Sequence, residues 1–575
     1  MRLGMRDAIF LSHSCSMRAH LLKIGGRKMK SVQARRRTGA GTLLALCLLA
    51  AAHASGTSSA STAPHAGAAA VSATWSLPGA DLANTRDVSG PINSSTVNQL
   101  GVAWTVPITP SGGAGVYATT PVVAGGVMYT QDLASNVEAV NVQTGGILWV
   151  HTYGSPDPGP NGVTVVNGTV YGATATSAFA LQAATGAQLW IKKLTRNANE
   201  GIDMAPGYDS GTVYVSTVPG NKTIFYAGNG QSILWALNAR TGATRWKWDE
   251  VPANLWSRRH RKINSGGGQW YPPSFDSQGN PYLGVSNPAP FPGTTMYPWG
   301  SSRPGPDLYT DSLVKLNVKT GKLVWYYQLT PHDIYDWDLQ NSPILTTANG
   351  KRVVIDGGKA GIVIELSAKT GKLLWKRSVG VHNGHDHDNL LAQTDPSKLH
   401  LPETVEPGRL GGVETQLASN GTTVFAAVNN LPVTYQGQNG PADETFPVQV
   451  SKGSGEFVAI DQNSGRIEWD DKLPSSPYGA ATVTNDVVFT TTYDGTLYAF
   501  DTQTGQTLWQ TRLAAGTAAP VTVVGDTVIT ASSFPSASGQ PPMIVAYRLG
   551  ATGTLPSATA ASSRRRDRLR RAAAG

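Results

Sequence analysis

The chain has 575 residues, including 64 glycines, 36 prolines and 15 tryptophans, and only 14% of its residues are charged. This composition is typical of a turn-rich β protein and argues against a helical bundle or a disordered chain. The net charge of +9 arises at the two ends, because residues 1–54 hold ten Lys and Arg and residues 564–571 hold six Arg. Without these segments and their two aspartates, 30 basic and 35 acidic residues remain. A nucleic-acid-binding domain would carry a surplus of basic residues within the fold, and the part of this chain between the two end segments has none.

The first 54 residues are predicted to be an N-terminal extension that ends in a secretory signal peptide. The sequence Met-Lys-Ser-Val-Gln-Ala-Arg-Arg-Arg begins at Met29, and the apolar run 43–52 follows it. A small-x-small sequence then ends at Ala54. A basic region, a short apolar region and a small-residue cleavage site are the three parts of a signal peptide. We therefore expect an exported protein, secreted or in the cell envelope, with no transmembrane helix in its mature form. Residues 55–72, rich in Ser, Ala, Thr and Gly, are predicted to be a disordered linker.

Both cysteines of the chain, Cys15 and Cys47, lie in the segment that we expect to be removed. The mature protein would then have no disulfide, zinc or thiol chemistry.

A short motif repeats along the chain from residue 139 onward. The sequence Ala-Val-Asn-Val-Gln-Thr-Gly-Gly-Ile-Leu-Trp ends at Trp149, and the same frame always has Gly four residues before Trp. The other copies end at Trp190, Trp246, Trp325, Trp375, Trp469 and Trp509. Each copy is predicted to be a strand, a tight turn that needs glycine for a positive φ, and a second strand whose tryptophan docks on the next unit. The shorter spacings, 41 and 40 residues, match the ~40–45 residues of a propeller blade.

An eighth unit is split between the two ends of the repeat region. Val-Ala-Trp-Thr-Val at 102–106 supplies a strand with a tryptophan but no turn, and Met543–Leu549 supplies a strand without a following turn. Together they would complete one blade. The sequence therefore predicts an all-β, eight-bladed β-propeller over residues 73–550, closed by its N- and C-terminal strands. Residues 551–575 are predicted to be a disordered basic tail.

Two intervals between tryptophans are much longer than a blade, 79 residues before Trp325 and 94 before Trp469. Extra length in a propeller forms loops, which is where sites are built on a rigid scaffold. Directly after Trp325 lies the stretch Thr-Pro-His-Asp-Ile-Tyr-Asp-Trp-Asp at 330–338. A carboxylate among aromatic rings loses hydration, which raises its pKa and suits it to remove a proton from an alcohol. Asp336 is the candidate general base.

The second long interval contains Val-His-Asn-Gly-His-Asp-His-Asp-Asn at 381–389. Its spacing fits no particular metal pattern. A solvated or hydrogen-bonded loop is the favoured interpretation, and a structural calcium site or the lining of a substrate channel is the alternative.

Five short motifs occur in a fixed order: Gly266–Trp270, Asn287–Pro290, Arg303–Tyr309, Thr330–Asp336 and Gly358–Gly361. With these motifs the chain resembles, from about residue 75 to 549, the quinoprotein dehydrogenases. These are eight-bladed propellers that carry pyrroloquinoline quinone (PQQ), often with calcium.

The resemblance implies a role for four residues. Trp270 would be the indole floor on which the PQQ ring stacks, and Lys359 would contact the quinone oxygens. Asn287 and Asp336 would be ligands of Ca²⁺, and Asp336 would also be the general base. The implied activity is PQQ-dependent oxidation of a small alcohol, polyol or sugar.

The chain departs from the family pattern at three places. The vicinal cysteine pair is absent, Asn161 stands where an arginine is expected, and residues 216–230 lack the expected metal-ligating glutamate. The chain also has no Cys-x-x-Cys-His haem motif, so an external electron acceptor would be needed.

Two other functions are compatible with the repeats. A propeller that has lost its cofactor could act as a binding or assembly scaffold in the cell envelope, and a glycan-binding module would present an exposed aromatic platform. Each candidate residue also has a structural interpretation. Trp270 could be a core residue, Asn287 a turn cap, Asp336 a solvated turn residue and Lys359 a surface lysine.

Overall fold

The computed structural model describes residues 74–108, 116–157, 159–221, 224–225, 230, 232–252, 254–445, 450–534 and 541–556. The predicted signal peptide and linker, and the arginine-rich end of the tail, lie outside these residues. The described part is an all-β unit with a single α-helix, α1 (Asp388–Thr394). Among these residues no helix has both the length and the apolar character needed to cross a bilayer.

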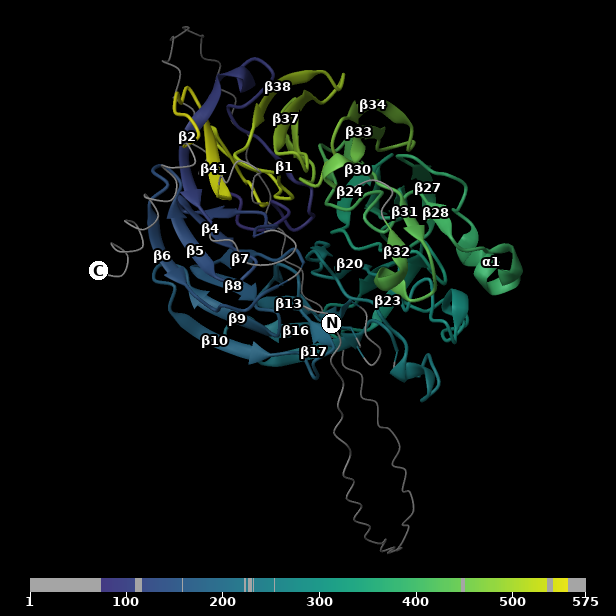
Figure 1. Cartoon of the computed structure of the whole chain (residues 1–575). Helices are drawn as coiled ribbons and strands as arrows, with labels where there is room; N and C mark the ends of the chain where they lie inside the picture. The colour runs from purple at the N-terminus through teal and green to yellow at the C-terminus, as the bar shows by residue number, and fades with distance from the viewer. Residues whose placement is uncertain are drawn as a thin grey trace, which may run out of the picture. The chain divides into compact units, whose positions relative to one another are not determined.

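Most strands belong to antiparallel sheets of four strands that follow one another along the chain (Figure 1). The first four sheets comprise β3 (Val122–Ala124), β4 (Val127–Gln131), β5 (Val137–Asn141) and β6 (Ile147–His151); β7 (Val163–Val166), β8 (Thr169–Ala173), β9 (Ser177–Gln182) and β10 (Gln188–Lys193); β12 (Gly207–Asp209), β13 (Thr212–Ser216), β16 (Ile233–Asn238) and β17 (Thr244–Asp249); and β19 (Ser274–Phe275), β20 (Pro281–Val285), β22 (Ser312–Leu316) and β23 (Leu323–Gln328).

The next three sheets have the same organisation. They comprise β24 (Ile344–Ala348), β25 (Lys351–Gly358), β26 (Ile362–Ser367) and β27 (Leu373–Ser378); β29 (Ala418–Ser419), β30 (Thr423–Asn430), β33 (Ser454–Asp461) and β34 (Ile467–Leu473); and β35 (Thr482–Thr484), β36 (Val487–Thr491), β37 (Thr496–Asp501) and β38 (Thr507–Arg512), with β1 (Asp87–Val88) parallel to β35.

The last of these eight sheets joins distant parts of the sequence. It contains β39 (Thr522–Val524), β40 (Thr527–Ala531), β41 (Met543–Leu549) and β2 (Leu100–Pro107), and β2 pairs antiparallel with β41 from Leu100 opposite Leu549 to Pro107 opposite Met543. In Figure 1 the purple β2 accordingly lies beside the yellow β41. The two strands of the split unit thus share one sheet.

The long loops carry short strands and turns of their own. These are β11 (Glu200–Gly201), β14 (Val218–Asn221) and β15 (Ile224–Phe225); β18 (Ser265–Gly266) and β21 (Pro288–Ala289); β28 (Glu403–Val405), β31 (Val433–Tyr435) and β32 (Glu444–Thr445); and the 3₁₀ helices Val97–Gln99, His260–Lys262, Pro298–Gly300, Pro396–Lys398, Gly440–Asp443 and Val450–Lys452.

The repeated glycine and tryptophan have linked roles. In the motif ending at Trp375, Gly371 has a φ of 70°, which glycine adopts without a steric cost. A Cβ at Gly371 would lie 2.6 Å from the ring of Trp325, the tryptophan of the preceding sheet. The indole nitrogen of Trp325 donates to the carbonyl of Ala368 in the same turn, at 3.3 Å. The same indole-to-turn hydrogen bond is made by Trp104, Trp149, Trp190, Trp246, Trp375 and Trp469. The predicted docking of each tryptophan on the next unit is confirmed for these seven residues.

The core lies between successive sheets. Phe425 and Phe457, from β30 and β33, pack against Val488 and Phe500, from β36 and β37, and all four are fully buried. The segment before β1 adds a polar clamp. Arg86 is fully buried and donates hydrogen bonds to the carbonyls of three separate segments, at Pro78, Ala481 and Val521. Its guanidinium therefore ties the N-terminal segment to two sheets near the C-terminus.

Candidate active site

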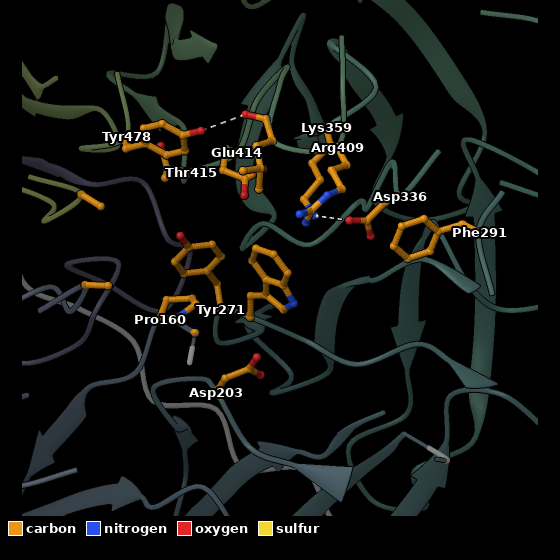
Figure 2. A pocket seen from close by; sticks show the side chains of 15 residues that line it. Pro160, Asp203, Tyr271, Phe291, Asp336, Lys359, Arg409, Glu414, Thr415 and Tyr478 are labelled. Atoms are coloured by element: carbon orange, nitrogen blue, oxygen red, sulfur yellow. Dashed lines mark hydrogen bonds and ion pairs between the residues drawn. The ribbon is translucent and has the colours of Figure 1, made fainter. Parts of the chain in front are cut away.

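A cavity of about 240 Å³ brings together three of the four residues that the sequence singled out, Trp270, Asp336 and Lys359 (Figure 2). They come from loops of two different sheets: Trp270 precedes β19, Asp336 lies between β23 and β24, and Lys359 directly follows β25. The other lining residues are Ala118, Gly159, Pro160, Asp203, Tyr271, Phe291, Arg409, Leu410, Glu414, Thr415, Tyr478 and Ala518.

The loop that carries Asp336 is organised by a neighbouring carboxylate. Asp333 accepts hydrogen bonds from the backbone nitrogens of Tyr335, at 2.9 Å, and Trp337, at 2.8 Å. Between these two residues, Asp336 has a φ of 64°, in the left-handed region that non-glycine residues rarely adopt. The turn therefore sends the Asp336 side chain into the cavity while Tyr335 and Trp337 are buried.

Asp336 is 3% exposed, so it is not a solvated turn residue. One carboxylate oxygen, Oδ2, accepts a hydrogen bond from Lys359 Nζ at 3.5 Å, and the other, Oδ1, is buried without a hydrogen-bond partner. Burial raises the pKa of Asp336 well above its usual range, and the nearby Lys359 ammonium opposes this shift. Asp336 thus combines an available oxygen with raised basicity.

Lys359 is 1% exposed and is held by charges and an aromatic ring. Its ammonium lies 4.4 Å from the centre of the Trp270 ring and forms ion pairs with Asp336 and Asp338. Burial lowers the pKa of Lys359, but the two aspartates outweigh it and the net shift is upward. The lysine therefore stays charged, and the surface-lysine interpretation does not apply.

Trp270 is positioned by a buried glutamate that the sequence did not single out. Glu250, at the end of β17, accepts hydrogen bonds from the backbone nitrogen of Gly268, at 2.6 Å, from Gln269 Nε2, at 3.0 Å, and from Ser216 Oγ, at 2.6 Å. Gly268 has a φ of 112°, and a Cβ there would lie 2.5 Å from the Val218 side chain. The glycine run therefore passes close to β14 and presents Trp270 to the cavity. Because Trp270 is half-buried and lines the cavity, it is not a core tryptophan.

Asn287, the fourth residue, is fully buried but lies outside the cavity lining. Its backbone nitrogen donates to Asp338 Oδ1 at 2.7 Å, its Nδ2 donates to the carbonyl of Pro288 at 3.1 Å, and its Oδ1 has no hydrogen-bond partner. Asn287 is therefore linked to the site through Asp338.

Two other motifs serve the loop that carries Asp336. The buried Arg303 pairs with Asp307 at 2.5 Å and donates to the carbonyl of Asp333 at 2.5 Å. In the His-Asp-His-Asp segment, His385 Nδ1 lies 2.7 Å from Asp388 Oδ2, which also accepts a hydrogen bond from the Tyr335 hydroxyl at 2.6 Å. The segment is thus a hydrogen-bonded loop that ties α1 to the residue next to Asp336.

Two family models match this chain. One, described as the β-propeller domain of glucose, ethanol and alcohol dehydrogenases, matches residues 75–163 and 226–406. The other, described as outer membrane protein assembly factor BamB, matches residues 133–269 and 417–573. Quinohemoprotein alcohol dehydrogenase of Comamonas testosteroni is 28% identical over 489 residues, covering 74% of this chain and 67% of that protein. Polyvinylalcohol dehydrogenase of a Pseudomonas species is 25% identical over 482 residues, covering 70% and 68%.

The crystal structure of the Comamonas testosteroni enzyme superposes with a TM-score of 0.72 at 25% identity, covering 84% of this chain and 82% of that one. Over most of its length, the chain is thus similar to PQQ-dependent, alcohol dehydrogenase-like proteins. These relatives are named alcohol dehydrogenases and cover most of the chain, which indicates an oxidoreductase, and the propeller-type neighbour agrees with the all-β fold.

The residues that line the cavity fit a flat quinone such as PQQ. Trp270 offers a ring face at the cavity wall, and the cavity is lined by two cations, Lys359 and Arg409. The residues that could bind a metal ion form a less complete site than those that could bind the quinone. Asn287 Oδ1 and Asp336 Oδ1 are buried acceptors without partners, which suits a hard cation. Within the described ranges, however, no group of three or more His, Cys, Asp or Glu side chains could hold a metal ion.

Three charged residues of the cavity were missed by sequence reasoning: Asp203, Arg409 and Glu414. Arg409 forms an ion pair with Glu444. Arg409 and Glu414 flank a Gly-Gly pair at 411–412 in the second long interval, a signal that could have marked this loop. Asp203 stands in the ordinary run Gly-Ile-Asp-Met, and nothing in the sequence sets it apart.

Proposed function

We propose that this protein is an exported dehydrogenase that uses PQQ to oxidise an alcohol, a polyol or a sugar, with Asp336 as the general base. One observation supports the proposal above all. Asp336, Lys359 and Trp270, which are separated in the sequence, face one cavity, and the free Oδ1 of Asp336 is buried there. A buried carboxylate oxygen without a partner is costly, and here it lies in a cavity that a substrate could enter.

The chain's own residues can perform the proton transfer. Oδ1 of Asp336 is available to accept the proton of a substrate hydroxyl, and the raised pKa of Asp336 makes it a stronger base than an exposed aspartate. Lys359 holds Oδ2 of the same carboxylate, which fixes its orientation. The surrounding cavity excludes most of the solvent and so strengthens these electrostatic interactions.

Lys359 and Trp270 are the residues that would hold the cofactor, and Asn287 and Asp336 are the ones that would offer oxygen atoms to Ca²⁺. Bound PQQ supplies a quinone that accepts two electrons from the alcohol. Because the chain has no Cys-x-x-Cys-His motif, we propose that an external acceptor takes these electrons onward.

We further propose that the seven four-stranded sheets and the five-stranded sheet that includes β1 form an eight-bladed propeller that the β2 and β41 pair closes. The antiparallel pairing of these terminal strands supports this arrangement, as do the seven indole contacts between neighbouring units.

A second candidate is a non-catalytic scaffold in the cell envelope. The match to the BamB model over residues 133–269 and 417–573 favours it. The two candidates differ in whether the cavity binds PQQ.

The test is a titration of the purified protein with PQQ in the presence of calcium, read by quenching of tryptophan fluorescence and by dye-linked oxidation of a panel of alcohols, polyols and sugars. Saturable quenching together with dye reduction is the expected result. If neither signal appears at micromolar PQQ with any divalent metal, the dehydrogenase is rejected in favour of the scaffold.

A further inference from the structure

Two carboxylates of the cavity have no role in the proton transfer described above. Asp203 and Glu414 are 6% and 7% exposed, and they line the cavity from opposite sides of Tyr271 (Figure 2). Asp203 Oδ1 and Glu414 Oε2 are buried without a hydrogen-bond partner. A buried carboxylate oxygen without a partner is costly, so these atoms need a donor or a proton.

The cations at the cavity are already matched by other carboxylates. Lys359 forms ion pairs with Asp336 and Asp338, and Arg409 forms one with Glu444. Among the described residues, Asp203 and Glu414 form no ion pair with either cation. They therefore come in addition to the three carboxylates that already pair with the two cations.

Both carboxylates bind protons more tightly than exposed acids do. Burial, together with the charge of Asp338, raises the pKa of Asp203 to about 7. Burial raises the pKa of Glu414 to about 7, although the charge of Lys359 opposes the shift. Both groups thus titrate close to neutral pH, where an ordinary carboxylate is fully ionised.

PQQ carries three carboxylates that are ionised at neutral pH. Beside an ionised Asp or Glu such a group is repelled, whereas a neutral carboxylic acid can donate a hydrogen bond to it. We propose that Asp203 and Glu414 are further cofactor-binding residues that hold the carboxylates of PQQ as neutral acids, so that loading of the cavity takes up protons. This inference rests on the proposed function, because it requires that PQQ enters the cavity.

The groups around Asp203 and Glu414 do not reverse the proton uptake that is expected when PQQ binds. The charged and titratable groups that interact electrostatically with Asp203 or Glu414 are Lys359, Asp338, Arg409, Tyr271 and Tyr478. The pKa values of Lys359, Arg409 and Tyr271 lie well above neutrality, as does that of Tyr478, so these groups keep their protons between pH 6 and 8. Asp203 and Glu414, each with a pKa of about 7, are therefore two cavity groups whose charge changes in this range.

The expected pH dependence follows from linkage. An acid with a pKa of about 7 in the free protein and a higher pKa beside the bound anion gains protons when the anion binds. Each such group makes the Kd for PQQ roughly tenfold higher at pH 8 than at pH 6, and two groups make it roughly 100-fold higher. A carboxylate set bridged to PQQ by a divalent cation would have the opposite sign, because metal binding releases protons.

The test measures the Kd of the full chain for PQQ from pH 6 to pH 8 by tryptophan quenching, in EDTA and again in excess calcium. Calorimetry in two buffers with different ionisation enthalpies counts the protons taken up. Glu414→Gln and Asp203→Asn, which carry neutral donors at every pH, should each bind PQQ about tenfold more tightly than the wild type at pH 8. Each should also retain only about half of the logarithmic pH slope.

Glu365→Gln is the matched control. The pKa of Glu365 is also raised to about 7 by burial, and Glu365 Oε2 also lacks a partner, but this residue lies on β26 outside the cavity. Its variant should keep the full pH slope.

The other possible outcomes separate a failure of this inference from a failure of the proposed function. If PQQ binds with a Kd that is independent of pH or that falls as pH rises, the inference is wrong while the proposed function stands. The same holds if Glu414→Gln and Asp203→Asn, both folded by circular dichroism, bind PQQ more weakly than the wild type at pH 8. If the wild type binds no PQQ at any pH, the inference and the proposed function both fail.

Discussion

The ammonium of Lys359 lies 4.4 Å from the centre of the Trp270 ring, although 89 positions separate the two residues in the sequence. The same ammonium pairs with Asp336 and Asp338. One buried cation thus connects the flat wall of the cavity to the candidate base. Attraction between an ammonium and an indole face increases when both are desolvated, which fixes the lysine against the ring.

Replacing Lys359 by methionine should destabilise the protein strongly. The substitution keeps the length of the side chain but leaves Asp336 and Asp338 buried without their cation, and breaking a buried pair in this way costs about 3–5 kcal/mol. Urea unfolding followed by circular dichroism measures the loss. Lys322→Met, at an exposed position of a repeat turn, is the control and should change the free energy of unfolding by less than about 0.5 kcal/mol. Equal effects of the two substitutions would argue against the buried ion pairs.

Replacing Asp336 by asparagine should abolish dye-linked alcohol oxidation while leaving tryptophan quenching by PQQ in place. Removal of a general base lowers the rate by roughly 10²–10⁴-fold. The control is Asp471→Asn, a half-buried aspartate on β34 outside the cavity, which should keep wild-type activity. Activity that survives in Asp336→Asn would assign the base to another residue.

Two alanine variants can measure how much the contact between a tryptophan and a turn glycine contributes to stability. Gly371 and Gly350 both have a φ of 70°, but a Cβ at Gly371 would lie 2.6 Å from the Trp325 ring, whereas a Cβ at Gly350 meets nothing within 4 Å. Gly350→Ala should therefore cost only the backbone strain of about 1–2 kcal/mol. Gly371→Ala should cost at least about 1 kcal/mol more, because the ring must move. Thermal unfolding of both variants measures the difference, and equal losses would refute the docking contact.

Glu250 should make the stability of the protein fall as pH rises from about 4.5 to 7. Burial raises its pKa from 4.5 to about 7, so in this range the folded state holds a proton that the unfolded state has lost. Over the whole range this difference is about 3 kcal/mol. Glu250→Gln removes the titration. Its free energy of unfolding, relative to that of the wild type, should therefore rise by about this amount between pH 4.5 and 7.5 in urea unfolding series. A constant difference across the range would show that Glu250 is ionised in the folded protein.

The repeat could be predicted from sequence because its causes are local. A turn that needs a positive φ selects glycine, and Gly371 and its counterparts show this at a fixed distance from tryptophan. The same holds for the turn around Asp336, where Asp333 bonds to nitrogens two and four residues ahead. Short-range geometry of this kind is visible in the order of residues.

The roles of individual site residues were harder to predict from the sequence. Lys359 was singled out only by the resemblance of the Gly358–Gly361 motif. Its burial could not be predicted, because it depends on contacts with Trp270, Asp336 and Asp338. Asn287 and Asp336 were expected to be metal ligands, and the structure shows that Asn287 donates a backbone hydrogen bond to Asp338.

The sequence by itself determined the all-β repeat, the pairing of glycine with tryptophan, and a candidate set made of Trp270, Asn287, Asp336 and Lys359. Only the tertiary structure showed that Asp203 and Glu414, 211 positions apart, line the same cavity as three members of that set, Trp270, Asp336 and Lys359. The reason is physical. Turn geometry is set by neighbouring residues, whereas desolvation and charge interactions depend on distances in space that arise only when separate sheets pack together.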